Sequence, residues 1–332
     1  MKPRSLPMPS CSEHTNPLGH GIWVIDTGYQ RPMFDAAYLM VEQGRAAFID
    51  TGTSLAVPRL LEALDAAGVA RDAVDWVIPT HVHLDHAGGA GALMAELPAA
   101  KLLVHPRGAR HLINPNVLLD SARAVYGDEE VRRAYGTVVP VEAGRVIESA
   151  DGMVIELAGR PLTLFDTPGH ARHHHCPWDE RSQGFFTGDT FGLSYREFDT
   201  PQGVWLLPTT TPTQFDPEAL RASIERMLTR QPQRMYLTHY GCIGDIAKLG
   251  RELLDQLDAV VALGERIRLQ QLAPDARHTA LTNGLSALYL QRLQLLGSTL
   301  TREHALGLLA MDIELNAQGM AGWLNAASPV KP

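Results

Sequence analysis

The stretch around residue 80 constrains this chain more than any other part of its sequence. An apolar run at 74–78 predicts a buried strand, and four potential metal ligands follow it: His81, His83, Asp85 and His86. Imidazole and carboxylate groups are ligands that zinc, iron and manganese accept. Alternate residues of an extended segment point the same way, so His81 and His83 face one point. Asp85 and His86 turn into a helix and can face a second point, which predicts a strand-to-helix turn serving two neighbouring metal ions.

The rest of the chain predicts mixed strands and helices followed by a purely helical region. Short β-type runs occupy 22–25, 37–41, 46–49, 101–104, 162–167, 185–189 and 234–238. Helical spacing of apolar residues occurs at 55–64, 217–230, 246–261 and 306–324, with Thr301 as an expected N-cap. We therefore expect an α/β body of sheet layers covered by helices. The expected parts are a loose arm at 1–20, a main domain at 21–242 and a helical region at 243–332.

Composition narrows the class of protein and its partners. A formal net charge of -8 argues against a protein that grips phosphate backbones. No stretch approaches the ~18 consecutive apolar residues of a membrane span, and the N-terminus lacks the apolar run of a secretory signal. Three cysteines (Cys11, Cys176 and Cys242) are too few for a disulfide framework. We expect a cytoplasmic protein that acts on a small molecule, without nucleic-acid or membrane partners. A homodimer is left open.

Five short motifs in order resemble those of the metallo-β-lactamase superfamily, over residues 20–242. The first contains Asp50 in the sequence IDTG, and the second is the HxHxDH cluster at His81–His86. The remaining three contain His170 in TPGH, Asp189 in TGDT and His239 in LTHYG. Each of these residues stands at or just beyond the end of a predicted strand.

The resemblance implies an αββα sandwich with a dinuclear metal site at one edge of its two sheets. The implied ligands are His81, His83 and His170 for one metal, Asp85, His86 and His239 for the other, and Asp189 as a bridge between them. Asp50 would orient the ligands from behind. Zinc is the favoured metal, and iron and manganese stay open because histidine and carboxylate suit all three.

The ligand set predicts hydrolysis of a small ester-type substrate, a thioester or a lactone, by a metal-bridging hydroxide. Two metals ~3.5–4 Å apart lower the pKa of a shared water and polarise a carbonyl oxygen. Asp85 would pass a proton to the leaving group, as the family resemblance suggests. The pattern is similar to that of glyoxalase II-like thioesterases and lactonases. His173 replaces the glycine of the glyoxalase II motif, which argues against glutathione thioesters in particular.

Other reactions remain open at this point. One alternative is a non-haem iron redox enzyme, such as a persulfide dioxygenase-like oxygenase. A phosphodiesterase is a second, and a catalytically silent binding protein is a third. The absence of an added flavin domain and of a basic surface favours the hydrolase.

Three residues near the ligands are candidates for substrate contact. Tyr195 and Arg196 follow Asp189 closely, and the Arg196 guanidinium could make a bidentate contact with a carboxylate or phosphate. Tyr240 directly follows His239. Core packing for Tyr240 and a surface ion pair for Arg196 are the plain alternatives. One histidine of the run 173–175 could brace the site. We expect the helical region at 243–332 to pack over the mouth of the site or onto a partner chain.

Overall fold

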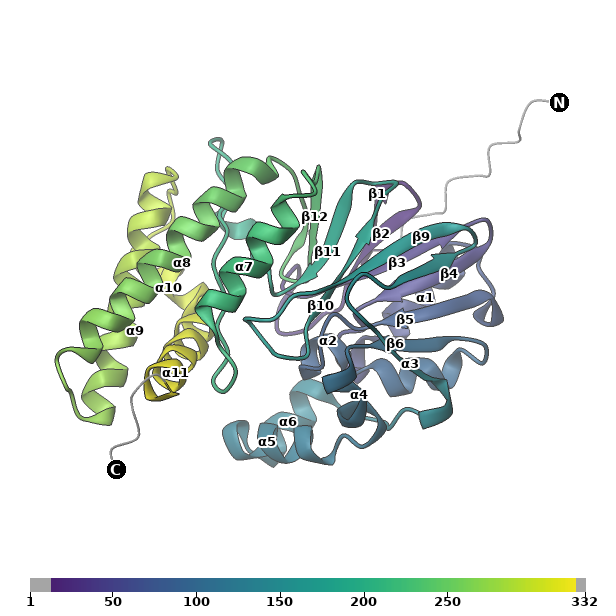
Figure 1. The fold of residues 1–332 in the computed structure, drawn as a ribbon, viewed down its shortest axis with the longest axis horizontal. Helices are drawn as coiled ribbons and strands as arrows, with labels where there is room; N and C mark the ends of the chain where they lie inside the picture. The colour runs from purple at the N-terminus through teal and green to yellow at the C-terminus, as the bar shows by residue number, and fades with distance from the viewer. Residues whose placement is uncertain (1–12, 327–332) are drawn as a thin grey trace. The chain divides into compact units, whose positions relative to one another are not determined.

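The computed structural model of the chain describes residues 13–326, which form two compact units (Figure 1). Unit 1 extends to Thr163 and unit 2 begins at Leu164. This division differs in kind from the predicted boundary at 242/243, which marks the change from mixed to purely helical structure. That change lies between β13 (Gly241–Ile243) and α8 (Ile246–Arg268).

Unit 1 contains a seven-stranded mixed sheet in the order β1-β2-β3-β4-β5-β6-β7. Its strands are β1 (Thr15–Gly19), β2 (Ile22–Asp26), β3 (Ala36–Glu42), β4 (Arg45–Ile49), β5 (Val74–Ile78), β6 (Lys101–Val104) and β7 (Val146–Glu148). Strands β1 to β4 pair in antiparallel fashion, and β4 to β7 pair in parallel. A further hairpin joins β8 (Val154–Leu157) to β9 (Arg160–Asp166), and β9 runs across the division between the units.

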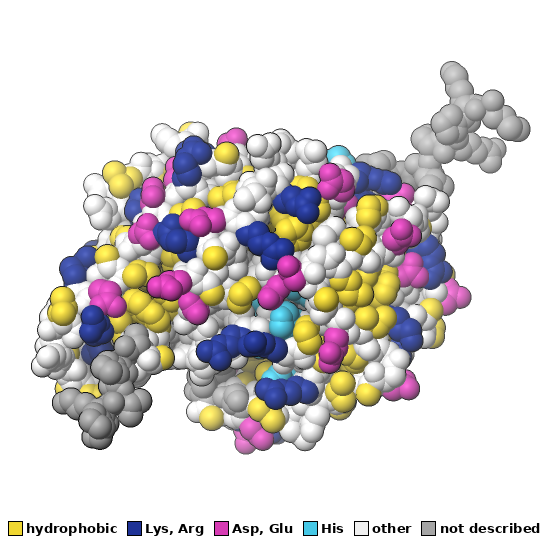
Figure 2. Space-filling view, viewed as in Figure 1, with side chains coloured by type: hydrophobic (Ala, Val, Ile, Leu, Met, Phe, Trp, Pro, Cys, Tyr) yellow, Lys and Arg dark blue, Asp and Glu magenta, His cyan; other side chains and the backbone are white. Residues whose placement is uncertain are grey.

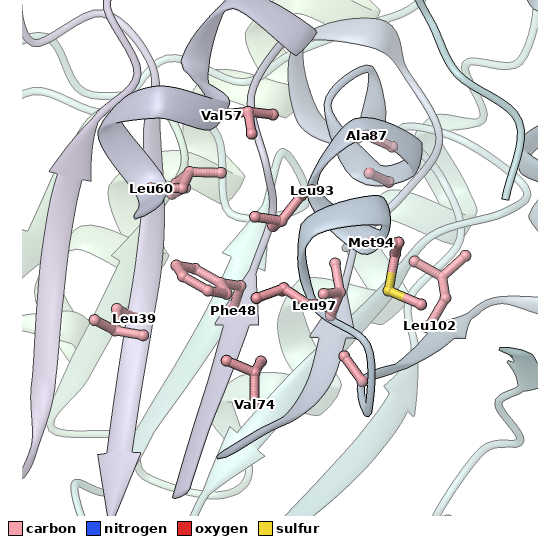
Figure 3. Packing of buried hydrophobic residues seen from close by; sticks show 14 of the residues in the cluster. Leu39, Phe48, Val57, Leu60, Val74, Ala87, Leu93, Met94, Leu97 and Leu102 are labelled. Carbon is pink, nitrogen blue, oxygen red and sulfur yellow. The ribbon is translucent and has the colours of Figure 1, made fainter. Parts of the chain in front are cut away.

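Helices cover the sheet of unit 1 and bury its apolar side chains. The helices are η1 (Ser54–Ala56), α1 (Val57–Ala66), η2 (Arg71–Ala73), α2 (Leu84–Ala87), α3 (Ala90–Glu96), α4 (Pro106–Ile113), α5 (Asn116–Tyr126), α6 (Asp128–Tyr135) and η3 (Ala143–Arg145). Figure 3 shows Leu60 of α1 and Leu93 of α3 beside Phe48 and Leu39 of the sheet. All four side chains are almost fully buried. Such burial of apolar surface is the main stabilising contribution to this unit.

Unit 2 contributes the strands β10 (His175–Asp179), β11 (Gly184–Gly188), β12 (Arg234–Leu237) and β13. The second sheet has the order β13-β12-β11-β10-β9-β8. The helices of this unit are η4 (Arg196–Phe198), α7 (Pro217–Leu228), α8, α9 (Pro274–Leu295), α10 (Arg302–Leu308) and α11 (Ala310–Ala326). Helices α8, α9 and α11 contact one another, as Figure 1 shows in green and yellow. Two mixed sheets with helices and a helical C-terminal region confirm the predicted α/β class.

Local sequence signals account for most of these elements. Asp216 caps α7 by accepting from the Ala219 N–H at 3.0 Å, and Pro217 takes the first helical position. Thr301 caps α10 as predicted, accepting from the His304 N–H at 3.2 Å. Strand β10 was not predicted, because its sequence HCPWD contains a proline and no alternation of polar and apolar residues.

The N-terminal segment differs from the expected loose arm. Residues 15–19 form β1, which pairs with β2 through a tight turn at 19–21 in which every residue has a positive φ angle. Main-chain pairing, with little apolar burial, holds this strand, so the hydrophobic pattern did not indicate it. The rest of the expected arm, including Cys11, lies outside the described residues.

Charged side chains of both signs lie on the surface. On the face that Figure 2 shows, lysine and arginine side chains are interspersed with aspartate and glutamate, as expected for a solvated acidic protein. Among residues 13–326, none of the helices combines the length and the apolar character that crossing a bilayer requires. Cys176 and Cys242 both carry free thiols.

Candidate metal centre

The first group of candidate ligands follows two neighbouring strands of unit 1. Strand β4 ends directly before Asp50, and β5 ends three residues before His81. Helix α2 then begins at Leu84 and carries Asp85 and His86. Because β4 and β5 are parallel, their carboxyl ends lie at the same edge of the sheet and bring these side chains together.

The four side chains of the HxHxDH cluster form two pairs. Nε2 of His81 and Nδ1 of His83 are 2.7 Å apart, and Nε2 of His86 lies 3.8 Å from Oδ2 of Asp85. His81 and His86 are fully buried, whereas His83 and Asp85 are half-buried. His81 with His83, and Asp85 with His86, therefore form two neighbouring donor pairs, and their division between two metal ions stays a prediction.

Asp50 fixes the orientation of His86. Its Oδ2 lies 2.9 Å from Nδ1 of His86, and its Oδ1 accepts from the Thr80 N–H at 2.7 Å. The Thr80 hydroxyl adds a further bond to the same carboxylate at 3.0 Å. With Nδ1 of His86 held by Asp50, Nε2 is the nitrogen that could bind a metal.

The second group of candidate ligands lies in unit 2, again beyond strand ends. His170 follows β9, Asp189 follows β11 and His239 follows β12. Gly169, directly before His170, has a φ of 131°, and a Cβ atom there would lie 2.2 Å from the backbone nitrogen of Leu220 in α7. The glycine therefore permits the close packing of α7 against the loop that presents His170.

Each oxygen of the Asp189 carboxylate faces a different imidazole. Nε2 of His170 lies 3.2 Å from Oδ2, and Nε2 of His239 lies 3.7 Å from Oδ1. All three residues are almost fully buried. A carboxylate with one histidine nitrogen at each oxygen is the donor arrangement that two adjacent divalent metals need, so these residues fit the metal pair that the motifs imply.

His174, in the middle of the histidine run, contacts a proposed ligand residue. Its Nε2 accepts from the Asp189 N–H at 3.2 Å, and the ring is fully buried. His173 and His175 are also buried, so none of the three is a surface histidine. This contact makes His174 the candidate for the bracing role expected of one histidine in this run, which stays a prediction.

The structure gives Tyr195 and Arg196 partners within unit 2. Tyr195 is 1% exposed and its hydroxyl donates to Oδ1 of Asp312 at 3.0 Å. The Arg196 guanidinium donates to the Ser194 carbonyl through Nε and Nη2, at 3.1 and 2.6 Å, and lies 3.3 Å from Asp199. These contacts engage the polar groups of both residues, and the substrate contact stays a prediction.

Tyr240 is also mostly buried. Its side chain is 6% exposed, and its N–H donates to the Ser194 carbonyl at 3.3 Å. The N–H of Ser194 in turn donates to the carbonyl of His239. The segment that contains Arg196 therefore holds the backbone on both sides of the His239–Tyr240 junction.

A pair of tyrosines near Asp85 was not predicted from the sequence. The hydroxyl groups of Tyr29 and Tyr135 lie 3.1 Å apart, and the two rings stack. Burial, followed by the negative charge of Asp85, raises the pKa of Tyr29 above its ordinary value, so the phenol stays protonated. Tyr29 also lines a cavity of about 170 Å³ with Leu55 and Arg133. No motif marks Tyr29, because the Tyr135 contact spans 106 residues of sequence.

Comparison with known proteins places these motifs in a family context. Residues 31–239 match the family described as the metallo-beta-lactamase superfamily. The chain is 28% identical over 230 residues to a metallo-beta-lactamase fold-containing protein of Sulfurisphaera tokodaii, which covers 68% of this chain and 79% of that protein. It is 30% identical over 190 residues to an acyl-coenzyme A thioesterase of Gallus gallus. That match covers 52% of this chain and 64% of the thioesterase, just under two thirds of its length.

A solved structure matches almost the whole chain in fold. The metallo-beta-lactamase family protein from Thermus thermophilus superposes with a TM-score of 0.64 at 20% identity. The match covers 93% of this chain and 95% of that chain. At this identity the likeness concerns the fold alone, and it extends over the C-terminal helices as well as the mixed sheets.

Proposed function

This chain belongs to the metallo-β-lactamase superfamily, and we propose that it is a two-metal hydrolase that cleaves the acyl–sulfur bond of a thioester. The family match spans more than half of the chain, residues 31–239. Membership, together with its hydrolase relatives, makes the chain a metal-dependent hydrolase. The thioester and the metal pair are the finer parts of the proposal.

The observation that carries the proposal is the Asp189 carboxylate with His170 at one oxygen and His239 at the other. Asp189 therefore has a histidine donor on each side, as a residue that would serve two metals requires. The pairing of ligands in unit 1 supports the same division. His83 stands at the second position of HxHxDH, so unit 1 offers two imidazoles to one metal and a carboxylate with an imidazole to the other.

The proposed ligands are His81, His83 and His170 for one ion, Asp85, His86 and His239 for the other, and Asp189 for both. Bound there, two divalent ions supply an activated water and polarise the scissile carbonyl group. We favour zinc, since imidazole-rich sites with carboxylate ligands suit it well. Asp50 keeps Nε2 of His86 turned toward the ion by holding Nδ1.

Asp85 is suited to a second task, the transfer of a proton to the leaving sulfur. Its side chain is 25% exposed, whereas that of His86 is 0% exposed, so the carboxylate can exchange protons with water. Tyr29 beside it stays protonated and neutral. A carboxylate held at this boundary can take a proton from the attacking water and deliver it as the carbon–sulfur bond breaks.

The thioester class is favoured over the lactone class by one relative. The Gallus gallus protein that is 30% identical is an acyl-coenzyme A thioesterase. Because the match spans only 64% of that protein, we extend to this chain the acyl–sulfur bond and not the coenzyme A portion of the substrate. A small-molecule thioester also agrees with the acidic net charge of the chain.

The proposal is tested with zinc-loaded protein and matched pairs of acyl thioesters and oxygen esters. We expect thiol release from the thioesters that stops when the metal is removed by a chelator and returns when zinc is restored. Turnover of lactones or phosphodiesters without any thiol release would show that those compounds, and not thioesters, are the substrates. Substrate-dependent oxygen uptake by iron-loaded protein, without hydrolysis, would replace the hydrolase by an oxygenase.

A further inference from the structure

The loop at 208–211 in unit 2 contacts two of the proposed metal ligands from behind. The Thr209 hydroxyl donates to the Asp189 carbonyl at 3.0 Å and lies 2.9 Å from Nδ1 of His170. The Thr211 hydroxyl donates to the His170 carbonyl at 2.9 Å. Thr209 and Thr211 are both almost fully buried, so water does not compete for these bonds.

Thr209 sets the tautomer of His170. A hydroxyl group has one hydrogen, and Thr209 donates it to Asp189. The contact with His170 must then have Nδ1–H as the donor and the Thr209 oxygen as the acceptor. In the neutral ring, Nε2 of His170 is then the nitrogen without a hydrogen, and it is the one that faces the Asp189 carboxylate at 3.2 Å. A metal requires this tautomer.

Asn316 of helix α11 holds the loop on both sides of Thr209. Its Oδ1 accepts from the Thr210 N–H at 2.8 Å, and its Nδ2 donates to the Pro208 carbonyl at 3.2 Å. The Thr210 hydroxyl donates to the Asn316 carbonyl at 3.1 Å. Nδ2 also donates to the hydroxyl of Tyr289 in α9 at 2.8 Å, which fixes the amide in this orientation.

The backbone of α11 reaches the same loop without a side chain in between. A Cβ atom on Gly319 would lie 2.1 Å from the Thr210 hydroxyl oxygen. Helix α11 and the loop therefore contact each other directly, and the Asn316 bonds are made at a close-packed junction. In Figure 1, α11 is the yellow helix nearest the C-terminus.

We propose that Asn316 is a positioning residue for the metal site. Through Thr209 it fixes the tautomer and direction of His170 and the backbone of Asp189. The helical C-terminal region thus supports the metal ligands from behind, a role different from the predicted cover over the mouth of the site. This inference rests on the proposed function, because it needs His170 and Asp189 to bind metal.

A control variant separates positioning from general stability. Gln256 of α8 is as buried as Asn316, and each is 3% exposed. Its amide accepts from the Trp205 ring N–H and donates to the Leu206 carbonyl, both at 2.8 Å. Gln256 thus holds the same connecting segment by similar bonds, but three residues before Thr209 and away from the ligands.

The experiment measures the zinc dissociation constant by chelator competition, and the thermal unfolding of the metal-free protein. We expect Asn316→Ala and Thr209→Val each to weaken zinc binding by roughly 10–100-fold, the usual effect of removing a partner that orients a ligand. Gln256→Ala should lower the unfolding temperature of metal-free protein to a similar extent while its zinc affinity stays near that of wild type. The Asn316 and Thr209 effects on zinc affinity should not add in the double variant.

Two results overturn the inference. The first is wild-type zinc affinity in Asn316→Ala, and the second is an equal loss of affinity in Asn316→Ala and Gln256→Ala. If Asn316→Ala does not fold, Thr209→Val, which changes the side-chain shape less, tests the contact through which Asn316 is proposed to act. Wild-type zinc affinity in Thr209→Val would then overturn the inference. Wild-type protein that binds no zinc would instead refute the proposed function, so the two failures are distinguishable.

Discussion

The main-chain N–H of Asp189 donates to Nε2 of His174, so the neutral His174 ring carries its hydrogen on Nδ1. The hydroxyl oxygens of Thr167 and Thr190 lie 2.9 and 3.2 Å from that nitrogen. Each ring nitrogen of this buried histidine is therefore satisfied. The Asp189 backbone is thereby held in place by a neutral imidazole.

Replacement of His174 should impair both stability and turnover. His174→Ala leaves the buried Asp189 N–H without an acceptor, which costs about 1–3 kcal/mol. His174→Gln places an amide oxygen near the position of Nε2 and should recover part of both losses. Urea unfolding and steady-state kinetics check this, and equal behaviour of the alanine and glutamine variants would count against it.

Metal content should depend on ligands from both units. We expect wild-type protein to hold two ions, and His81→Ala and Asp189→Ala each to lose metal, because each removes a donor of the proposed site. His278→Ala serves as a control, since His278 pairs with Glu314 on the helical region and its side chain is 40% exposed. Elemental analysis after metal-replete expression gives the measurement, and wild-type content near zero would refute the ligand assignment.

Asp85→Asn should lower kcat by roughly 10²–10⁴-fold, the usual contribution of a proton-transfer group. The amide keeps the shape of the carboxylate, but it is a weaker ligand and cannot carry the proton. Asp65→Asn, on the exposed face of α1, is a matched control that changes the net charge equally. The assay compares kcat at saturating zinc, and an unchanged kcat in Asp85→Asn would exclude the proton-transfer role.

Arg196→Ala distinguishes a structural role from a substrate contact. The bonds to Ser194 predict a loss of roughly 1–3 kcal/mol in the free energy of unfolding, since charged donors are removed from a carbonyl group. Arg196→Lys should recover part of this loss. A raised KM with unchanged unfolding would instead support the substrate contact that the sequence indicates.

The protein should lose stability between about pH 9 and 11. Burial raises the pKa of Cys242 from 9.0 to about 11 and that of Tyr236 from 10.0 to about 12. Above pH 9 the unfolded chain therefore releases these protons before the folded chain does, and the free energy of unfolding falls as pH rises. Urea unfolding at pH 8 and pH 10 measures the fall, which should be smaller in Cys242→Ala. An equal fall in that variant would exclude Cys242 as a cause.

Local features of the site were predictable because they depend on neighbouring residues. The pairs within the HxHxDH cluster follow from the strand and helix that meet at residues 78–84, and both elements have clear apolar patterns. The strands before Asp50, Asp189 and His239 were predicted for the same reason. A short continuous apolar run is typical of a strand buried on both faces, and β4, β11 and β12 are buried along almost their whole length.

Contacts between distant segments could not be predicted in this way. Asn316 and Thr210 are separated by 106 residues, and nothing near either one marks the other as its partner. The sequence also placed Leu55 on the buried face of a helix, yet it is 58% exposed because α1 begins only at Val57. Helical spacing placed the start of the helix two residues too early, and Leu55 instead lies in the 3-10 helix η1.

The direct contact between Gly319 and Thr210 has a consequence for protein engineering. Exchanging the C-terminal helices for those of a relative would bring a foreign surface against residues 208–211, whose shape fits the bare backbone of α11 at this point. A chimera should therefore take the segment 208–211 and helix α11 from the same parent. A single join in the exposed turn between α8 and α9, around residue 271, would take the two from different parents, so residues 208–211 must be exchanged together with the helices that follow this turn.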